Sequence, residues 1–190
     1  MRGLALSLIL VAVAGDVVAQ GLGAAADREK KRREALRAQE WQEFRGPAGD
    51  FKVSFPYPPM RKREAIPGAP TMMDTFVAVK NERSFVVRVG ELPRASLDQE
   101  TRAKMLGGVR ETLLRESRGQ IERERPLRIG AHEWNEIRIR TKPEGDIEML
   151  LLGRVCIVPE RIFLLLSAAK ASDPDTATTE KFFASFEILR

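Results

Sequence analysis

Four arginines offer the clearest binding chemistry in this sequence of 190 residues. Arg138 and Arg140 alternate along one predicted strand, and Arg154 and Arg161 lie on the two apolar strands predicted to follow it. Guanidinium groups on neighbouring strands can together clamp a carboxylate or a phosphate, because each is planar and presents several N–H donors. These four residues are therefore the candidate binding site. The simpler interpretation, which we favour, is that each guanidinium is solvated and paired with a glutamate, the candidates being Glu136, Glu148 and Glu160.

His132 is the only histidine, and a catalytic interpretation depends on it. It opens the segment HEWNE, which lacks the second histidine that the helical zinc motif requires one turn further on. The segment is predicted as a strand, where neighbouring side chains point to opposite faces, so Glu133 is turned away from His132. No serine lies in a nucleophile-elbow sequence. We therefore expect no catalytic residue and no metal ligand.

An envelope hydrolase or transferase with a site around His132 is the alternative to this non-enzymatic interpretation. A concave pocket that holds His132 near a carboxylate would favour the enzyme, because general acid–base chemistry needs a partner within hydrogen-bond reach. A place for His132 on a flat or buried strand would favour a binding protein.

Cys156 is the only cysteine, and it lies between the apolar residues Val155 and Ile157. A thiol in such a strand is expected to be buried and unreactive. A single cysteine also excludes a disulfide within the chain, so the core alone must hold the domain together. The glycine patterns of phosphate-binding and dinucleotide-binding loops are absent, and we expect no cofactor.

The overall charge favours a mixed, solvated surface. Hydrophobic residues make up 43 % of the chain and charged residues 31 %, which allows a packed core under a soluble surface. The formal net charge is +5, from 32 basic and 27 acidic residues that are interleaved along the sequence. Because the charges are not segregated, a nucleic-acid footprint is disfavoured. We expect another protein or an envelope component as the partner, and no nucleic acid.

Residues 1–19 have the pattern of a secretory signal peptide. Arg2 gives a short positive region, and residues 4–14 form an apolar run that is too short to span a bilayer. Small residues allow cleavage after Ala19 or after Ala26, and an uncleaved anchor is the third possibility. The prediction is a secreted or periplasmic protein.

Residues 20–43 are expected to form a charged helical linker before a domain spanning 44–190. Good helix formers dominate the segment, and apolar side chains are few, which is typical of a solvated helix. The basic residues within 27–37 can also contact an anionic membrane surface weakly, although the acidic residues among them oppose this contact.

The domain is organised around residues 149–169, MLLLGRVCIVPERIFLLLSAA. The pair Pro159-Glu160 divides this stretch into two predicted strands. Leu164 and Leu165 then point to opposite faces of the second strand, and both are apolar. A strand that is apolar on both faces must be covered on both faces. We therefore expect both leucines to be buried in a central sheet with a layer on each side.

Further strands and two helices are predicted around this centre. The strands are expected near 51–55, 63–66, 71–80, 83–91, 120–128 and 132–141, with a short one within 186–189. A helix is expected over 96–118, with Ser96 and Gln99 as a capping box and Gly119 as the C-cap. The pair Gly107-Gly108 within it suggests close packing on the sheet or a kink. A second helix is expected to begin with Asp173 as its cap and Pro174 at its first position.

Three stretches carry a resemblance to a known family. They are the opening strand FKVSFPYPP at 51–59, the strand RIFLLL at 161–166 and the closing segment FFASFEI at 182–188. The last contains a Phe-x-x-Ser-Phe pattern at Phe182, Ser185 and Phe186. The chain from about Phe44 to Arg190 resembles the PsbP/Mog-like domains, in particular exported bacterial members of unknown function.

This resemblance implies an α+β fold, namely an α/β/α sandwich whose central sheet is mostly antiparallel and flanked by helices. Relatives of this fold serve as extrinsic subunits and protein-binding modules, and they are not usually enzymes. No functional motif of those relatives is present, so no site residue follows from the resemblance. The sequence as a whole predicts an exported, non-catalytic binding or accessory domain of unknown ligand.

Overall fold

The computed structural model describes residues 41–65, 72–93, 98–141, 147–173 and 176–189. The predicted signal peptide, nearly all of the predicted linker and the basic residues of 27–37 lie outside these ranges. The chain divides into two units, residues 1–37 and 38–190, and the described elements all belong to the second. The first of them, β1, begins at Gln42, before the expected domain start at 44.

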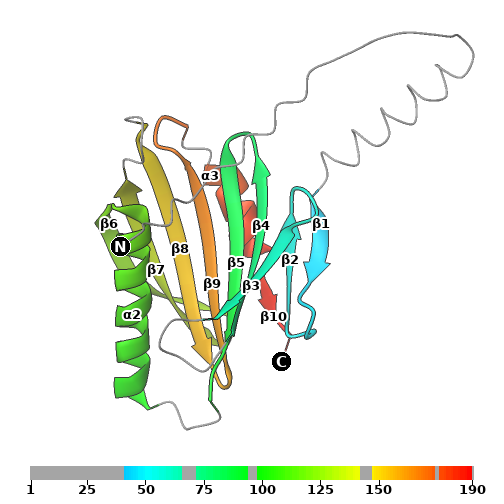
Figure 1. Cartoon of the computed structure of the whole chain (residues 1–190), viewed down its shortest axis with the longest axis vertical. Coiled ribbons are helices and arrows are strands. Elements are labelled where there is room, and N and C mark those ends of the chain that lie inside the picture. The colour runs from blue at the N-terminus through cyan, green and yellow to red at the C-terminus, as the bar shows by residue number, and fades with distance from the viewer. Residues whose placement is uncertain (1–40, 66–71, 94–97, 142–146, 174–175, 190) are drawn as a thin grey trace, which may run out of the picture. The chain divides into compact units, whose positions relative to one another are not determined.

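Seven antiparallel strands form the main sheet, in the order β3-β4-β5-β9-β8-β7-β6 (Figure 1). Their bounds are β3 Met60–Ala65, β4 Met72–Lys80, β5 Arg83–Glu91, β6 Gln120–Ile129, β7 His132–Thr141, β8 Met149–Val158 and β9 Arg161–Lys170. β8 and β9 lie near the middle, as the long apolar stretch predicted. The edge strands β3 and β6 are the polar ones, because an edge strand buries least.

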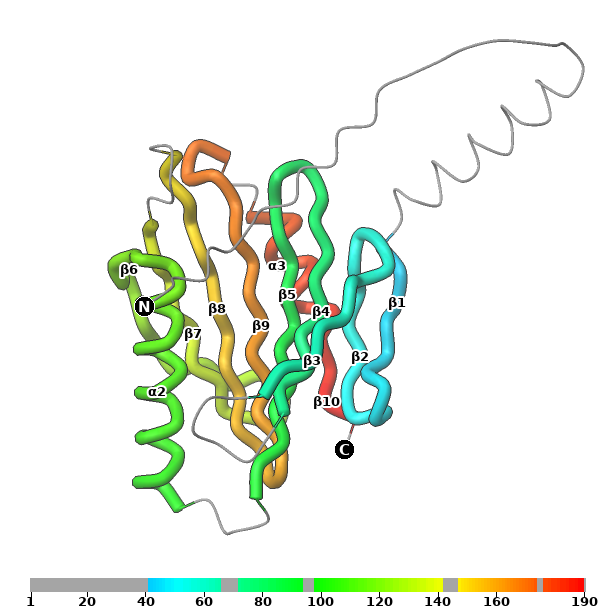
Figure 2. Tube along the Cα trace, in the orientation of Figure 1, coloured from blue at the N-terminus to red at the C-terminus, as the bar shows by residue number. Residues whose placement is uncertain are grey.

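A second, three-stranded sheet has the order β1-β2-β10. Its strands are β1 Gln42–Arg45, β2 Phe51–Phe55 and β10 Glu187–Ile188, all antiparallel. β2 buries Phe51, Val53 and Phe55 almost completely, which is the alternation that predicted a half-buried strand. Figure 2 shows this small sheet beside β3 and β4, with the chain end at β10 joining the opening strands.

The two described helices lie on opposite faces of the main sheet. α2 (Gln99–Ser117) packs Leu113 against Ile139 of β7 and Val155 of β8 in one apolar cluster. α3 (Thr176–Ala184) contributes Phe182 and Phe183 to the other cluster, which also holds the phenylalanines of β2. In Figure 1, α2 stands in front of the sheet and α3 behind it.

The expectation of a sheet buried on both sides is confirmed. Leu164 is 6 % exposed and belongs to the cluster under α2, whereas Leu165 is 1 % exposed and belongs to the cluster under α3. The fold is therefore α+β with a mostly antiparallel sheet, as predicted. The layer that carries α3 also contains the small sheet, so that face is covered by strands as well as by a helix.

The caps of α2 differ from the prediction. Asp98 is the N-cap, and its carboxylate accepts a hydrogen bond of 2.7 Å from the Thr101 backbone N–H. The predicted cap Ser96 lies outside the described residues, and the helix begins too late for it. At the other end Arg118, and not Gly119, adopts the left-handed conformation, with φ 50°. Gly119 has a different role, because a Cβ there would come within 2.6 Å of the Arg140 carbonyl oxygen.

The interpretation of Gly107 and Gly108 as close-packing residues is wrong. A Cβ at either position would meet nothing within 4 Å. The helix runs unbroken through both residues. Each glycine therefore costs the helix about 1 kcal/mol relative to alanine, without a packing contact to explain it. The expected start of α3 at Asp173-Pro174 falls partly outside the described residues.

Candidate functional site

The four predicted arginines face the same side of the main sheet, the side that carries α3, but they do not form one patch. Arg138 and Arg140 lie on β7 and share the carboxylate of Glu122 on β6. Arg154 lies on β8 under α3, and Arg161 lies at the β8–β9 turn. Each group has its own carboxylates. The four predicted arginines therefore do not form a single site.

Arg154 is buried and holds a structural network. Its Nε donates to Glu136 at 2.9 Å, and its outer nitrogen donates to Glu180 of α3 at 3.1 Å. Its guanidinium carbon lies 4.4 Å from the centre of the Phe183 ring. The side chain is thus fully engaged in fastening α3 to the sheet and is not free to bind a ligand.

Arg161 fastens the small sheet in a similar way. Its Nε donates to Asp50 at 2.9 Å, and Asp50 precedes β2 directly. A second carboxylate, Glu91 of β5, lies 3.6 Å from the same guanidinium. The expected partner Glu160 contributes its backbone carbonyl, which accepts from Arg161 at 3.4 Å. Arg161 therefore joins the two sheets.

Arg138 and Arg140 belong to a different group that includes two arginines the sequence analysis missed. In the β6–β7 register, Arg123 lies directly opposite Arg138, and Arg125 lies opposite Glu136. Directly opposed residues share a face, so all four guanidinium groups stand on one side of this strand pair. We call Arg123, Arg125, Arg138 and Arg140 the arginine surface. Their side chains are between 39 and 52 % exposed.

Two carboxylates lie beneath the arginine surface. Glu136 is 2 % exposed and accepts from Arg123 at 3.2 Å and from Arg125 at 2.9 Å, besides its bond to Arg154. Glu122 is 28 % exposed and pairs with Arg138 at 2.8 Å and with Arg140. The outer layer is therefore positive and the inner layer negative.

Both carboxyl groups are held in the ionised form. Burial alone would raise the pKa of Glu136, but hydrogen bonds and charges from Arg125 and Arg154 outweigh it, so this pKa lies below its usual value. The hydrogen bond from Arg140 is the main cause that lowers the pKa of Glu122. Even so, Glu136 pairs with three arginines and Glu122 with two. Among the four arginines of the arginine surface, only Arg140 pairs with a further carboxylate in the described ranges, Glu148 at 3.0 Å.

His132 lies at a different place, on a shallow hollow of about 210 Å³. The hollow is built from the start of α2, the β6–β7 hairpin and the β8–β9 turn. Its lining consists of Arg102, Arg128, Ala131, His132, Glu133, Ile157, Val158 and Pro159. His132 is thus on neither a flat nor a fully buried strand, and a carboxylate is present in the same hollow.

This arrangement meets only part of the criterion set for an enzyme. No hydrogen bond joins the side chains of His132 and Glu133 in the described structure, and the lining contains no hydroxyl or thiol nucleophile. Cys156 is buried, and loss of solvation raises the pKa of its thiol to about 12, so the thiolate is disfavoured. Within the described ranges, no group of three or more His, Cys, Asp or Glu residues is placed to hold a metal ion.

Solved structures with a similar fold were found for this chain. The cyanobacterial PsbP (CyanoP) of Synechocystis sp. PCC 6803 matches with a TM-score of 0.58 at 12 % identity, covering 79 % of this chain and 93 % of that one. The fold is PsbP-like. Two weaker structural matches have TM-scores of 0.46 and 0.40, to proteins of Bacteroides thetaiotaomicron and Pseudomonas aeruginosa, at 12 and 11 % identity. They cover 80 and 75 % of this chain, and 49 and 94 % of those chains.

The similarity to known proteins is limited to the PsbP-like fold. No protein-family model matches the sequence, and no curated protein matches it either. In the part of the chain that the structure describes, neither helix is long and apolar enough to cross a membrane. The predicted resemblance to the PsbP/Mog-like domains is confirmed at the level of fold, and what the chain binds must be argued from its own surface.

Proposed function

We propose that the protein is an exported, non-catalytic binding or accessory domain, and that its arginine surface binds an acidic region of another envelope protein. The observation that supports this most is the shared pairing at that surface. Four half-exposed guanidinium groups form ion pairs with only two carboxylates, those of Glu136 and Glu122. Glu136, the more buried of the two, also pairs with Arg154. The outermost N–H donors are therefore left to solvent or to a partner.

The placement of like charges strengthens the proposal. Arg123 and Arg138 lie directly opposite each other across β6 and β7, and such like-charged pairs weaken a sheet by some tenths of a kcal/mol. A carboxylate of a partner would bridge the two and relieve the repulsion, since guanidinium groups bind carboxylates in bidentate geometry. The nearby carboxylates Glu148 and Glu180 would repel a continuous polyanion, so a protein surface with discrete acidic residues fits better than nucleic acid.

Capture of the partner from an envelope extract tests this proposal. Wild-type protein is expected to retain a specific protein, and the double variant Arg123→Gln with Arg138→Gln is expected to lose most of it. The physical reason is the loss of two exposed charges that face the partner, while the buried Arg154–Glu136 pair remains. The readout is the amount of the same protein retained by each variant at equal, low salt.

The control removes the same charge elsewhere. Arg45 and Arg63 are both exposed. Arg45 lies on β1 of the small sheet, and Arg63 lies on β3, at the opposite edge of the main sheet from β6. The double variant Arg45→Gln with Arg63→Gln should retain the partner as wild type does. Equal losses from both double variants would show that net charge and not the arginine surface matters, and retention by both would contradict the proposal outright.

Export is part of the proposal and rests on the sequence of residues 1–26. A reporter fused after residue 26 is expected to cross the inner membrane and to be shortened near Ala19 or Ala26. Size and compartment of the reporter, measured by fractionation, give the answer. A fusion that stays cytoplasmic at full length would end the export hypothesis. The weak contact between residues 27–37 and an anionic membrane remains a subsidiary proposal, testable by vesicle binding.

We infer a variant of the α/β/α sandwich, in which the small sheet β1-β2-β10 completes the layer that contains α3. The aromatic contacts support this: Phe55 of β2 and Phe85 of β5 both lie against Phe182 of α3, at 5.7 and 5.3 Å between ring centres.

The hydrolase or transferase alternative keeps one observation in its favour, the hollow that holds His132 and Glu133. General acid–base chemistry would need these groups, or a substrate between them, within hydrogen-bond distance. Turnover of any envelope substrate that is lost in a folded His132→Ala variant would favour this alternative over the binding function.

A further inference from the structure

We propose that the hollow at His132 is a second, separate binding site, which takes the carboxylate or phosphate group of a small ligand. The site lies at the end of the sheet where α2 begins, toward the bottom of Figure 1. It does not share residues with the arginine surface. The proposal is therefore independent of the protein partner proposed above.

The unused polar groups of the hollow carry this inference. Within the described ranges, the side chains of Arg102, Arg128, His132 and Glu133 have no hydrogen bond and no ion pair. Some arginines elsewhere are paired: Arg88 with Glu116 at 3.1 Å, and Arg61 with Asp74 at 3.0 Å. Four polar residues without a described side-chain partner thus line one hollow of about 210 Å³.

The framework around the hollow is built from short connections that fix its shape. The β6–β7 hairpin turns at Gly130, which has φ 59°. The β8–β9 turn places Glu160 at φ 64°, and the Glu160 carbonyl accepts from the Leu92 backbone N–H at 2.9 Å. The Asp98 cap begins α2 just before Arg102. The polar residues of the hollow therefore flank a hairpin turn or lie in the first turn of α2, and the β8–β9 turn is bonded to Leu92.

The composition of the lining selects the ligand. Arg102 and Arg128 supply guanidinium donors for an oxyanion, and His132 adds a third group that can donate. Glu133 lies directly opposite Arg128 in the strand register, and its own negative charge disfavours a ligand that carries a second negative charge. The best ligand carries one carboxylate or phosphate group with a hydrogen-bond donor beside it. Apolar contacts come from Ile157, Val158 and Pro159.

The sole histidine gives this site its own reporter. In NMR spectra of the purified protein, the ring signals of His132 are expected to shift in a saturable way when inorganic phosphate or acetate is added. Arg102→Gln and Arg128→Gln should each weaken phosphate binding about tenfold, because each removes a charged donor worth about 1.4 kcal/mol. Glu133→Gln should strengthen it, since the repelling charge is gone.

Control and contrary outcomes separate a site from general ionic effects. Arg63→Gln removes an exposed arginine on β3, far from the hollow in the strand order, and should leave phosphate binding unchanged. Comparison of phosphate with acetate decides which oxyanion is preferred. A His132 signal that does not saturate, or that responds equally in the wild type and in both arginine variants, would overturn the proposal. A weakening by Glu133→Gln would overturn the assigned role of Glu133.

Discussion

Replacing Leu165 with alanine is expected to lower the free energy of unfolding by about 2–5 kcal/mol, and Leu164→Ala is expected to do the same. The two side chains are adjacent in β9 but lie in different cores, one under α3 and one under α2. Each change therefore opens a cavity in a separate, close-packed layer. Denaturant unfolding of the two variants measures the effect.

A matched control for these variants is Val79→Ala on β4, because Val79 is apolar, in the same sheet and 54 % exposed. It should change stability by less than about 0.5 kcal/mol. If Leu164→Ala were as mild as Val79→Ala, while Leu165→Ala remained severe, the sheet would be covered on one face only. The layered fold described above would then be wrong.

Glu136→Ala is expected to cost about 3 kcal/mol, because it leaves the buried Arg154 guanidinium without its main partner. Arg123 and Arg125 lose the same carboxylate and are left to repel each other. Glu180→Ala provides the comparison, since Glu180 also pairs with Arg154 but is 57 % exposed. That variant should cost less than about 1 kcal/mol. Equal costs would contradict a central role for Glu136.

Because Glu136 is ionised in the folded chain, the stability of the protein is expected to depend on pH. The pKa of Glu136 in the folded chain lies below its value of 4.5 in the unfolded chain. A lowered pKa contributes stability that is complete above the unfolded value and is lost as the pH falls through the folded value. Wild-type protein should therefore lose stability below about pH 4.5 more steeply than Glu136→Ala does. Parallel curves for the two proteins would contradict this.

The sequence was sufficient to predict most of the sheet. Alternation in β2 and β5 reports which residues are buried. In β9 the apolar pattern on both faces, at Leu164 and Leu165, requires cover on both sides. Local patterns were less reliable at helix ends. Asp98 competes with Ser96 as a cap by the same chemistry, and only the position of the helix on the sheet decides between them.

The binding surface could not be predicted, because it depends on strand register. A bulge between Ile121 and Arg123 shifts β6 by one residue against β7. Without that shift, Arg123 would lie opposite Ile137 and face α2, since a slip of one residue moves every side chain to the other face. With it, Arg123 and Arg125 join Arg138 and Arg140. No local signal in the sequence marks the bulge.

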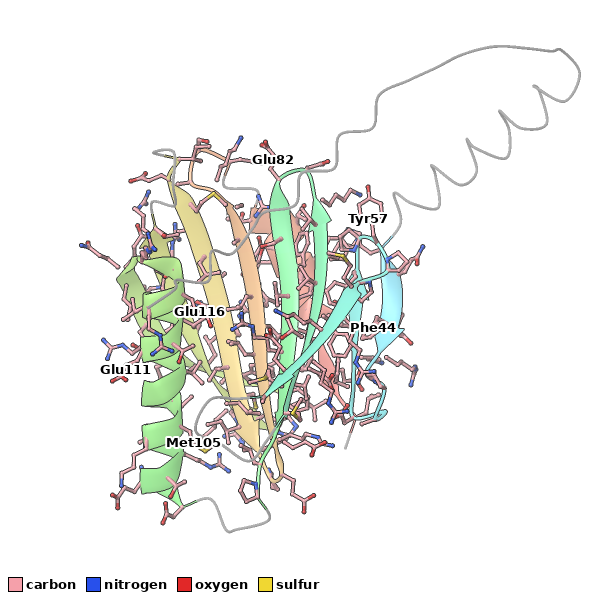
Figure 3. The ribbon with its side chains drawn as sticks, viewed as in Figure 1. Phe44, Tyr57, Glu82, Met105, Glu111 and Glu116 are labelled. Carbon is pink, nitrogen blue, oxygen red and sulfur yellow. The ribbon has the colours of Figure 1, made fainter. Side chains whose placement is uncertain are left out.

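The separation of Arg154 and Arg161 from this group has a similar cause. Their positions along β8 and β9 were predicted correctly, but their partners come from distant segments, Glu180 of α3 and Asp50 before β2. Such pairings arise only once the second layer is packed on the sheet. Figure 3 shows how densely side chains fill the described domain, with Glu111 on the outer side of α2 and Phe44 by the small sheet.

The most direct test of a binding role for the arginine surface is the salt dependence of the affinity for the captured partner. Exposed ion pairs are screened by salt, with a Debye length of about 10 Å at 0.1 M. We expect wild-type protein to bind the partner about tenfold more tightly at low salt than the Arg123→Gln, Arg138→Gln variant does, and we expect this difference to shrink as salt is raised. Identical dissociation constants for the two proteins at every salt concentration would contradict it.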